Sequence, residues 1–202
     1  MSAAAVEQPH GESALIAEAN RLMERNPGYR VEIIGGQLLV SPPPDGPHGV
    51  AMTDVMLPFA SAGLHGAESK IVPGIGLWLP TGSDDYAIPD LSLVDGDYRE
   101  HYVSNNCYDP VCFRLVVEVT SSNYRTDLRT KVAAYAEAKV SVYVIVDRKH
   151  ERLHVLSSPV GDGYESHRPY AAGELVVLPD IIGAKVTLDA AAIIEAGRPQ
   201  RS

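Results

Sequence analysis

The sequence predicts a mixed α/β fold in which helices flank a mixed central β-sheet. Two strand-like runs, 113–119 and 140–146, are almost continuously apolar, which is typical of strands covered on both faces. Between them, apolar residues recur at helical spacing over 126–138, so the three segments predict a strand–helix–strand crossover. The chain shows neither an internal repeat nor a second composition zone. We therefore expect one domain over 12–202, preceded by a flexible tail over 1–11.

The N-terminal part predicts a helix followed by a hairpin. Apolar residues recur at helical spacing over 12–25, and an Asn-Pro-Gly sequence at 26–28 ends that pattern. Residues 29–40 predict a β-hairpin whose two-residue turn is the Gly-Gly pair at 35–36. We expect this hairpin to be an extra element beside the central sheet.

The remaining elements follow in quick succession. A proline-rich loop over 42–47 leads into a second helix, which we expect from His48 to Ala62. A Thr-Asp pair at 126–127 is suited to cap the crossover helix. Outside the crossover, strands are expected over 71–79, 87–94, 152–156, 173–177 and 186–188. The last of these are additional C-terminal strands.

The composition indicates a soluble globular protein. Of 202 residues, 45% are hydrophobic and 21% are charged, which excludes a disordered, collagen-like or coiled-coil chain. No apolar run approaches the ~20 residues that a membrane-spanning helix needs, and the N-terminus lacks the basic and apolar regions of a signal peptide. We therefore expect a cytoplasmic protein without membrane association. Cys107 and Cys112 are expected to be reduced thiols.

The charge balance is acidic. The net charge of -9, from 17 basic and 26 acidic residues, does not by itself favour nucleic acid as a partner. It does not exclude one either, because enzymes that bind DNA through a divalent metal have acidic sites. Basic residues gather around the crossover helix and the end of the next strand, at Arg125, Arg129, Lys131, Lys139, Arg148 and Lys149. They form either a phosphate-facing surface or an ordinary solvated face.

Two acidic residues interrupt apolar strand-like runs. Asp90 lies within the run 87–94, and Glu118 lies within the run 113–119. An ionised carboxylate is costly to bury without a partner, so both positions call for an explanation. Lys131 lies at the edge of the apolar stripe of the crossover helix, which would direct it towards the strand that contains Glu118.

Two carboxylates on neighbouring strands, together with a lysine, form a hard-oxygen site suited to Mg²⁺ or Mn²⁺. We predict that Asp90 and Glu118 bind the metal, with a backbone carbonyl beside Glu118 as a third ligand. Such a metal lowers the pKa of a bound water and stabilises charge on a phosphoryl oxygen. Lys131 would orient the water or neutralise charge on the phosphate. The alternative is that backbone amides satisfy both acids and that Lys131 extends along apolar surface to solvent.

The same residues carry a resemblance to a known family. The matching positions are Glu32, Ser41-Pro42, His48, Pro89-Asp90, Val117-Glu118-Val119, Ser121, Arg125, Asp127, Lys131, Tyr135 and Val146-Asp147. With this pattern, over about 29–194, the sequence resembles the Uma-two family of restriction-endonuclease-like proteins in the PD-(D/E)xK nuclease superfamily. The resemblance implies an αβββαβ nuclease core and a divalent metal held by Asp90 and Glu118.

The position of the lysine and three other residues distinguish this sequence. In the basic form of the superfamily the lysine follows the acid by two residues, a position that is Thr120 here. The resemblance implies that the lysine has moved to the following helix, where Lys131 lies. Gln37 replaces a commonly acidic residue, which would remove one charge from the metal environment. Ser122 and Lys139 also depart from the family pattern, with effects on local geometry.

Glu32 and His48 are accessory candidates. Glu32 lies in an alternating Val-Glu-Ile stretch, which also fits an exposed edge position. His48 lies at a helix start after the proline-rich loop. There it would contact phosphate or assist the water, or it would be incidental.

Residues 150–154 spell His-Glu-Arg-Leu-His, the HExxH pattern of zinc peptidases. That chemistry needs both histidines one turn apart on a helix. Here the stretch follows a buried strand and alternates like the second arm of a hairpin, where residues four apart lie about 13 Å from each other. A zinc metallopeptidase is a remote alternative that would need helical structure and a third ligand such as Glu165 or His167.

The leading hypothesis is a Mg²⁺-dependent endonuclease that hydrolyses DNA phosphodiester bonds, with Asp90, Glu118 and Lys131 as its catalytic residues. The rival hypothesis is a nuclease-fold protein that binds or scaffolds without catalysis. The acidic net charge and Gln37 favour this rival somewhat. A homodimer would suit the cutting of both strands of a duplex.

Overall fold

The structure, a computed structural model, describes residues 13–120 and 126–199. The predicted tail over 1–11 lies outside the described residues, as do Ser121, Ser122 and Arg125. The helices are α1 (Ala14–Arg25), α2 (Gly46–Ser61), α3 (Lys131–Glu137) and α4 (Ala190–Ala196), and a π-helical turn (Thr126–Thr130) precedes α3. The strands are β1 (Arg30–Ile34), β2 (Gln37–Ser41), β3 (Ser69–Pro73), β4 (Gly76–Trp78), β5 (Tyr86–Ala87), β6 (Leu91–Asp95), β7 (Tyr102–Ser104), β8 (Cys107–Tyr108), β9 (Phe113–Val119), β10 (Val142–Asp147), β11 (Arg152–Val160), β12 (Gly163–Ala171), β13 (Leu175–Val177) and β14 (Thr187–Asp189).

The predicted crossover lies at the centre of a six-stranded sheet of order β12-β11-β10-β9-β6-β3. β9 and β10 are parallel neighbours, and the other neighbouring pairs in this sheet are antiparallel. Both central strands are buried along nearly their whole length, which explains their continuous apolarity. The prediction of a mixed sheet flanked by helices is confirmed.

A second six-stranded sheet, of order β2-β1-β5-β4-β8-β7, corrects the expectation of a single central sheet. The N-terminal hairpin β1–β2 forms one edge of this sheet and is not a separate addition. The predicted strands over 71–79 and 87–94 each split into two strands that belong to different sheets. Gly74, with φ of 63°, separates β3 from β4. Pro89 has no N–H to donate and separates β5 from β6.

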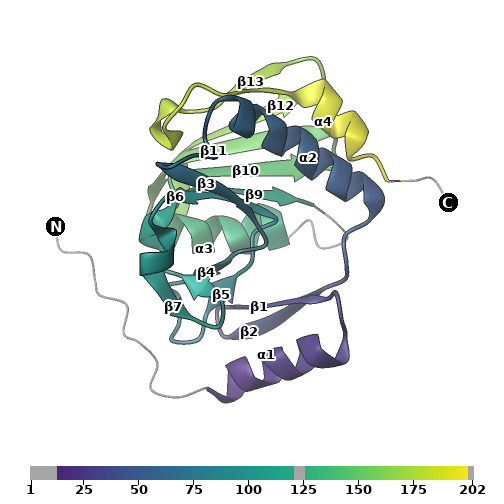
Figure 1. The fold of residues 1–202 in the computed structure, drawn as a ribbon. Helices are drawn as coiled ribbons and strands as arrows, with labels where there is room; N and C mark the ends of the chain where they lie inside the picture. Colours follow the sequence, from purple (N-terminus) through teal and green to yellow (C-terminus); the bar gives the residue numbers. More distant parts are fainter. Residues whose placement is uncertain (1–12, 121–125, 200–202) are drawn as a thin grey trace.

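Three apolar cores join the layers, whose arrangement is shown in Figure 1. α2 and α4 cover one face of the larger sheet, where Phe59 packs with Val117. The other face of that sheet looks towards α3 and the second sheet, and Val116 and Tyr135 belong to this central core. α1 covers the outer face of the second sheet. The chain therefore crosses between the two sheets beside a core that α3 helps to fill.

Among the described residues, the strands β7, β8 and β12 and the helix α4 are missing from the sequence-based expectation. The side chains of β12 are mostly exposed, so the strand has no apolar run to reveal it. β13 and β14 lie near the predicted strands 173–177 and 186–188, but they pair with each other as a separate two-stranded sheet. Among the helices of the described residues, none is long and apolar enough to cross a membrane.

Candidate active site

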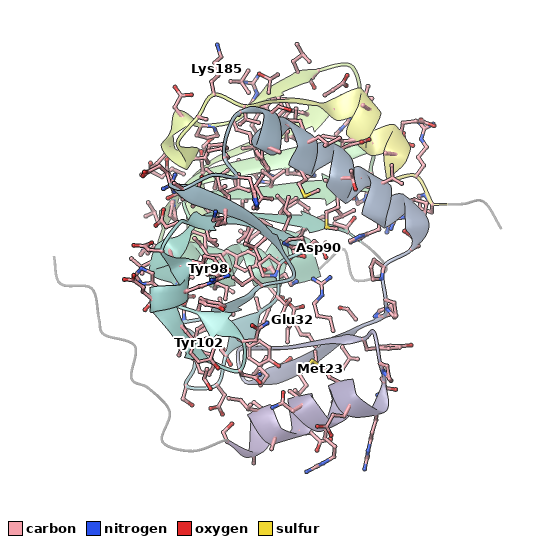
Figure 2. The ribbon with its side chains drawn as sticks, in the orientation of Figure 1. Met23, Glu32, Asp90, Tyr98, Tyr102 and Lys185 are labelled. Atoms are coloured by element: carbon pink, nitrogen blue, oxygen red, sulfur yellow. The ribbon has the colours of Figure 1, made fainter. Side chains whose placement is uncertain are left out.

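Asp90 lies where the chain passes from one sheet to the other, immediately before β6 and not inside a strand as predicted. Figure 2 shows it between the two sheets, near the middle of the molecule. The side chain is buried, and its Oδ2 accepts a hydrogen bond from Val119 N over 2.7 Å. His48 Nε2 lies 3.0 Å from the same oxygen. The other oxygen, Oδ1, pairs with the Arg30 guanidinium.

Glu118 points into the space between the two sheets. Val116 belongs to the central core whereas Val117 packs towards α2, so Glu118 shares the face of Val116. Its Oε1 accepts a hydrogen bond from Lys131 Nζ over 2.8 Å and another from the Tyr135 hydroxyl over 2.7 Å. Both donors come from α3, so the crossover helix orients the carboxylate of the strand beneath it.

Lys131 is almost fully buried, with its ammonium between two carboxylates. Nζ lies 2.8 Å from Glu118 Oε1 and 3.0 Å from Glu32 Oε1. Glu32 Oε1 also accepts Ile88 N over 2.7 Å and thereby fixes the segment that leads to Asp90. Glu32, which Figure 2 shows below Asp90, is therefore a buried member of the cluster and not an exposed edge residue.

His48 is placed by the start of α2, which begins two residues before the predicted position. Asp45 caps this helix, because its Oδ1 accepts His48 N over 2.8 Å. The imidazole then reaches back to Asp90. Since a carboxylate only accepts hydrogen bonds, His48 Nε2 carries the hydrogen and orients Asp90.

Arg30 belongs to the site but is absent from the predicted set. Its guanidinium donates to Ile88 O and pairs with Asp90, and its Nη1 lies 3.8 Å from Glu118 Oε2. A sequence signal was available: Arg30 and Glu32 are two positions apart on β1, so their side chains share one face.

These side chains meet at a pocket of about 180 Å³. The loop 41–45 forms one wall. Arg148, which follows β10, forms a second wall. Its guanidinium donates hydrogen bonds to Gly197 O and, over 2.7 Å, to Asp45 Oδ2. The residues described above that line the pocket are Arg30, His48, Asp90, Glu118, Val119 and Lys131. The pocket therefore joins both carboxylates, the lysine and two arginines.

Burial and charge act in opposite directions on Asp90. Burial alone would raise its pKa, but the hydrogen bond from His48 and the charge of Arg30 hold that pKa well below its usual range. Burial would also lower the pKa of Arg30, but the carboxylates of Asp90 and Glu118 raise it. Burial, with Glu118 beside it, raises the pKa of Tyr135 well above its ordinary value. The site therefore holds an ionised aspartate, a charged arginine and a neutral tyrosine that donates.

The donor set fits a magnesium-type ion. Asp90 and Glu118 supply hard carboxylate oxygens, and Mg²⁺ is usually bound by one or two carboxylates together with waters and substrate phosphates. Over residues 13–120 and 126–199, no group of three or more His, Cys, Asp or Glu side chains could hold a metal by itself. The two carboxylates suit an oxygen-preferring divalent ion whose other ligands would be water and substrate.

Three residues singled out in the sequence have structural explanations. Thr120, at the superfamily's usual lysine position, is buried, and its Oγ1 accepts Arg148 N over 3.0 Å. Gln37 is exposed at the hairpin and lies outside the pocket lining, so the expectation that it removes a charge from the metal environment is wrong. Lys139 follows α3 with φ of 61°, a conformation that favours glycine.

The HExxH stretch is not helical. His150 and Glu151 lie in a turn and His154 lies in β11, so the zinc-peptidase alternative loses its structural basis. Both histidines instead face Asp147. His150 Nδ1 lies 2.6 Å and His154 Nε2 lies 3.6 Å from Asp147 Oδ2, and His154 Nδ1 lies 2.9 Å from His167 Nε2.

Comparisons with known proteins agree with this architecture. The family described as "Uma2: Putative restriction endonuclease" matches residues 16–191. Among solved structures, the chain is similar to "a putative nuclease belonging to DUF820" from Anabaena variabilis, with a TM-score of 0.65 and 13% identity over 83% of this chain and 90% of the other. At this identity the likeness shows a shared fold, and no curated protein matches. Because the family match spans both sheets and every described residue of the pocket, the chain belongs to the Uma2 family.

Proposed function

We propose that this chain is a divalent metal-dependent nuclease that hydrolyses phosphodiester bonds of DNA. The observation that carries the proposal is the convergence of Asp90, Glu118 and Lys131 on one pocket, from a sheet junction, a central strand and a helix. The description of the family supports the same class of reaction. A phosphodiester is also the substrate for which a hard metal and an ammonium are suited.

Asp90 and Glu118 would hold Mg²⁺ or Mn²⁺. When bound, such an ion supplies a Lewis acid that lowers the pKa of a bound water and stabilises charge on the phosphoryl group. Asp90 is ready to bind it because its pKa lies below the usual range, while His48 and Val119 N fix the orientation of its carboxylate. Two donors from α3 fix Glu118 in the same way.

Lys131 acts on the reacting groups from the pocket wall. Its Nζ is held between Glu118 and Glu32, so the ammonium has a fixed position before any substrate binds. From there it donates to the attacking water or to a phosphoryl oxygen on which negative charge grows in the transition state. Preorganised donors of this kind need no rearrangement during the reaction.

The decisive experiment measures cleavage of plasmid and single-stranded DNA with Mg²⁺ or Mn²⁺. Lys131→Met should slow cleavage by about 100-fold or more, as is typical when one charge-stabilising donor is lost. Lys185→Met is the matched control, because Lys185 is exposed and lies at the far edge of the molecule from Asp90 in Figure 2. Cleavage that persists in Lys131→Met, in protein whose circular dichroism is unchanged, would contradict the proposed role.

Metal binding is tested separately, by thermal unfolding. Mg²⁺ or Mn²⁺ should raise the unfolding midpoint of the wild type, because the ion binds the folded state, and Asp90→Asn and Glu118→Gln should each abolish the rise. Asp97→Asn, which changes an exposed acid, is the control and should keep it. A rise that survives both site substitutions would place the ion elsewhere.

The rival hypothesis is that the chain keeps the nuclease fold but binds nucleic acid without cutting it. Stabilisation by metal, with no cleavage of any nucleic acid, would favour that rival. The homodimer stays a prediction, which sedimentation of the protein with and without duplex DNA would test.

A further inference from the structure

The two carboxylates of the candidate active site use their oxygens differently. One oxygen of each acid faces the groups that hold it in place. Asp90 Oδ2 accepts a hydrogen bond from Val119 N and lies next to His48. Glu118 Oε1 accepts hydrogen bonds from Lys131 and Tyr135. The second oxygens, Asp90 Oδ1 and Glu118 Oε2, both face the Arg30 guanidinium. A divalent ion shared by these two acids would need the same oxygens.

Arg30 is built into this position. Its backbone is fixed in β1, its side chain is 23% exposed on the pocket wall, and its guanidinium also donates to Ile88 O. A guanidinium is planar and presents several donors, so it can bridge two carboxylates that a divalent ion would otherwise bridge. The nearby acids also keep it charged against the effect of burial.

The charges of the cluster support an exchange between Arg30 and the ion. Among the described side chains of the cluster, Glu32, Asp90 and Glu118 carry three negative charges, and Lys131 and Arg30 balance two of them. A divalent ion added beside Arg30 would leave the cluster with an excess positive charge in a buried setting, which is unfavourable. The same ion in place of the guanidinium would leave the charges balanced.

We infer that Arg30 is a positioning residue that holds Asp90 and Glu118 together in the metal-free protein and must release Asp90 Oδ1 for a divalent ion to bind. The inference rests on the nuclease function proposed above, because it concerns the same two carboxylates. It adds that metal affinity is set by competition with a side chain of this protein. Arg30 thus lowers the apparent affinity for the ion while it holds the two carboxylates in place.

Calorimetric titration with Mn²⁺ tests this inference without measuring cleavage. Arg30→Met should bind Mn²⁺ about tenfold or more tightly than the wild type, because the competing cation is gone. Arg114→Met is the matched control, since its loss changes the net charge equally and Arg114, 26% exposed, also pairs with a carboxylate, Asp95, but lies outside the pocket lining. Its affinity should stay close to that of the wild type, which separates direct competition from the general field of the protein.

Each outcome of this titration decides the inference. Equal or weaker binding by Arg30→Met, beside measurable binding by the wild type, would overturn the role of Arg30 and leave the proposed metal site intact. Absence of binding in both proteins would overturn the inference and the metal-dependent function together. Equally tightened binding in Arg114→Met would also overturn it, because long-range charge would then explain the gain.

A second measurement needs only the wild type and one conservative variant. The Arg30 Nε–H resonance is identified by its loss in Arg30→Lys, and Mg²⁺ is then added to ¹⁵N-labelled wild-type protein. The resonance should shift with the same Mg²⁺ dependence as binding, while that of Arg148 Nε, which donates to Gly197 O, should stay in place. A stationary Arg30 resonance at saturating Mg²⁺ would refute the exchange.

Discussion

Three acidic side chains in or beside the pocket accept hydrogen bonds from backbone N–H groups. Asp90 accepts Val119 N, Glu32 accepts Ile88 N, and Asp45 accepts His48 N. Asp90 and Glu32 therefore each join two segments of the chain, and Asp45 caps α2, in addition to carrying a charge in or beside the pocket. Substitution of such an acid removes structure and charge together, so a loss of activity identifies a catalytic role only when the free energy of unfolding is measured as well.

The contact between His154 and His167 predicts that stability falls in acid. Their facing ring nitrogens lie 2.9 Å apart, so one ring donates and the other accepts, and two protonated rings would repel. Burial lowers the pKa of both histidines. The pKa of His154 is lowered further by His167 and by His150, whereas Asp147 raises it. Below about pH 6.5 the folded chain then binds fewer protons than the unfolded chain, so the free energy of unfolding should decrease as the pH falls.

Urea denaturation at about pH 7.5 and about pH 5.5 measures this effect. His167→Gln should lose less stability on acidification than the wild type, because glutamine keeps a polar side chain without a second charge. His101→Gln is the control, since His101 lies apart from this pair and faces Asp97. The same acid-induced loss in His167→Gln and in the wild type would rule out the repulsion.

Some residues of the site could be predicted from the sequence and others could not. Asp90 and Glu118 stand out because an acid inside an apolar run needs an explanation, and Lys131 because it lies at the edge of an apolar stripe. Arg30 is marked only by its position two residues before Glu32 on the same face of β1, and this spacing does not reveal its partner. Its partner Asp90 lies 60 positions away, and such a pairing depends on how the two sheets meet.

At the scale of elements, Asp85 fixes the β1–β2 hairpin to the segment before β5. Its Oδ2 accepts Gly35 N over 2.7 Å and the Thr81 hydroxyl over 2.6 Å, and its Oδ1 accepts Gly36 N over 3.0 Å. Both glycines have positive φ, as a two-residue hairpin turn requires. Asp85→Ala should therefore lower the free energy of unfolding by about 2–3 kcal/mol, because hydrogen bonds to a charged group contribute about 1.5–3 kcal/mol each and partly overlap.

Urea denaturation of purified variants checks this value. Asp84→Ala serves as the control, because Asp84 is the half-buried neighbour of Asp85 and its loss should change stability by no more than about 0.5 kcal/mol. If Asp85→Ala and Asp84→Ala were equally stable, the hairpin would not depend on this carboxylate.

The first helix and the crossover helix followed from apolar periodicity and the central strands from continuous apolar runs, but the partition of strands between sheets followed from neither. The run 71–79 has the same pattern whether it forms one strand or two. Its first part pairs with β6, and its second part pairs with β5 and with β8, of which β8 is distant in sequence. β12 could not be predicted because a mostly exposed strand needs no apolar alternation. Only its pairing with β11 defines it as a strand.

Over the whole molecule, the site depends on the junction of two sheets and not on one supersecondary unit. Glu32 comes from the second sheet, Glu118 from the larger sheet and Lys131 from the helix between them. Figure 1 shows α1 as the outermost layer below the second sheet and α2 with α4 as the opposite one. Changes that loosen the contact between the layers should therefore reach the pocket even when no lining residue is altered.

The two cysteines allow the opening of these layers to be followed. Cys107 lies in the core between α1 and the second sheet, and Cys112 lies in the central core between the sheets. Both are buried free thiols, and burial raises the pKa of each to about 12. Because the thiolate is the reactive form, neither should react with Ellman's reagent at about pH 8 until its layer opens.

Single-cysteine variants distinguish the two layers. In Cys112→Ser the remaining thiol reports on the α1 layer, and in Cys107→Ser it reports on the central core. Cys107 should react sooner, because the core under α1 is the smaller one and regions with less buried apolar surface open at lower free energy. Both thiols should react at once in denaturing urea, which supplies the reference rate. Equal rates for the two thiols in native buffer would mean that the layers open together. The central core beside the pocket would then open as readily as the core under α1.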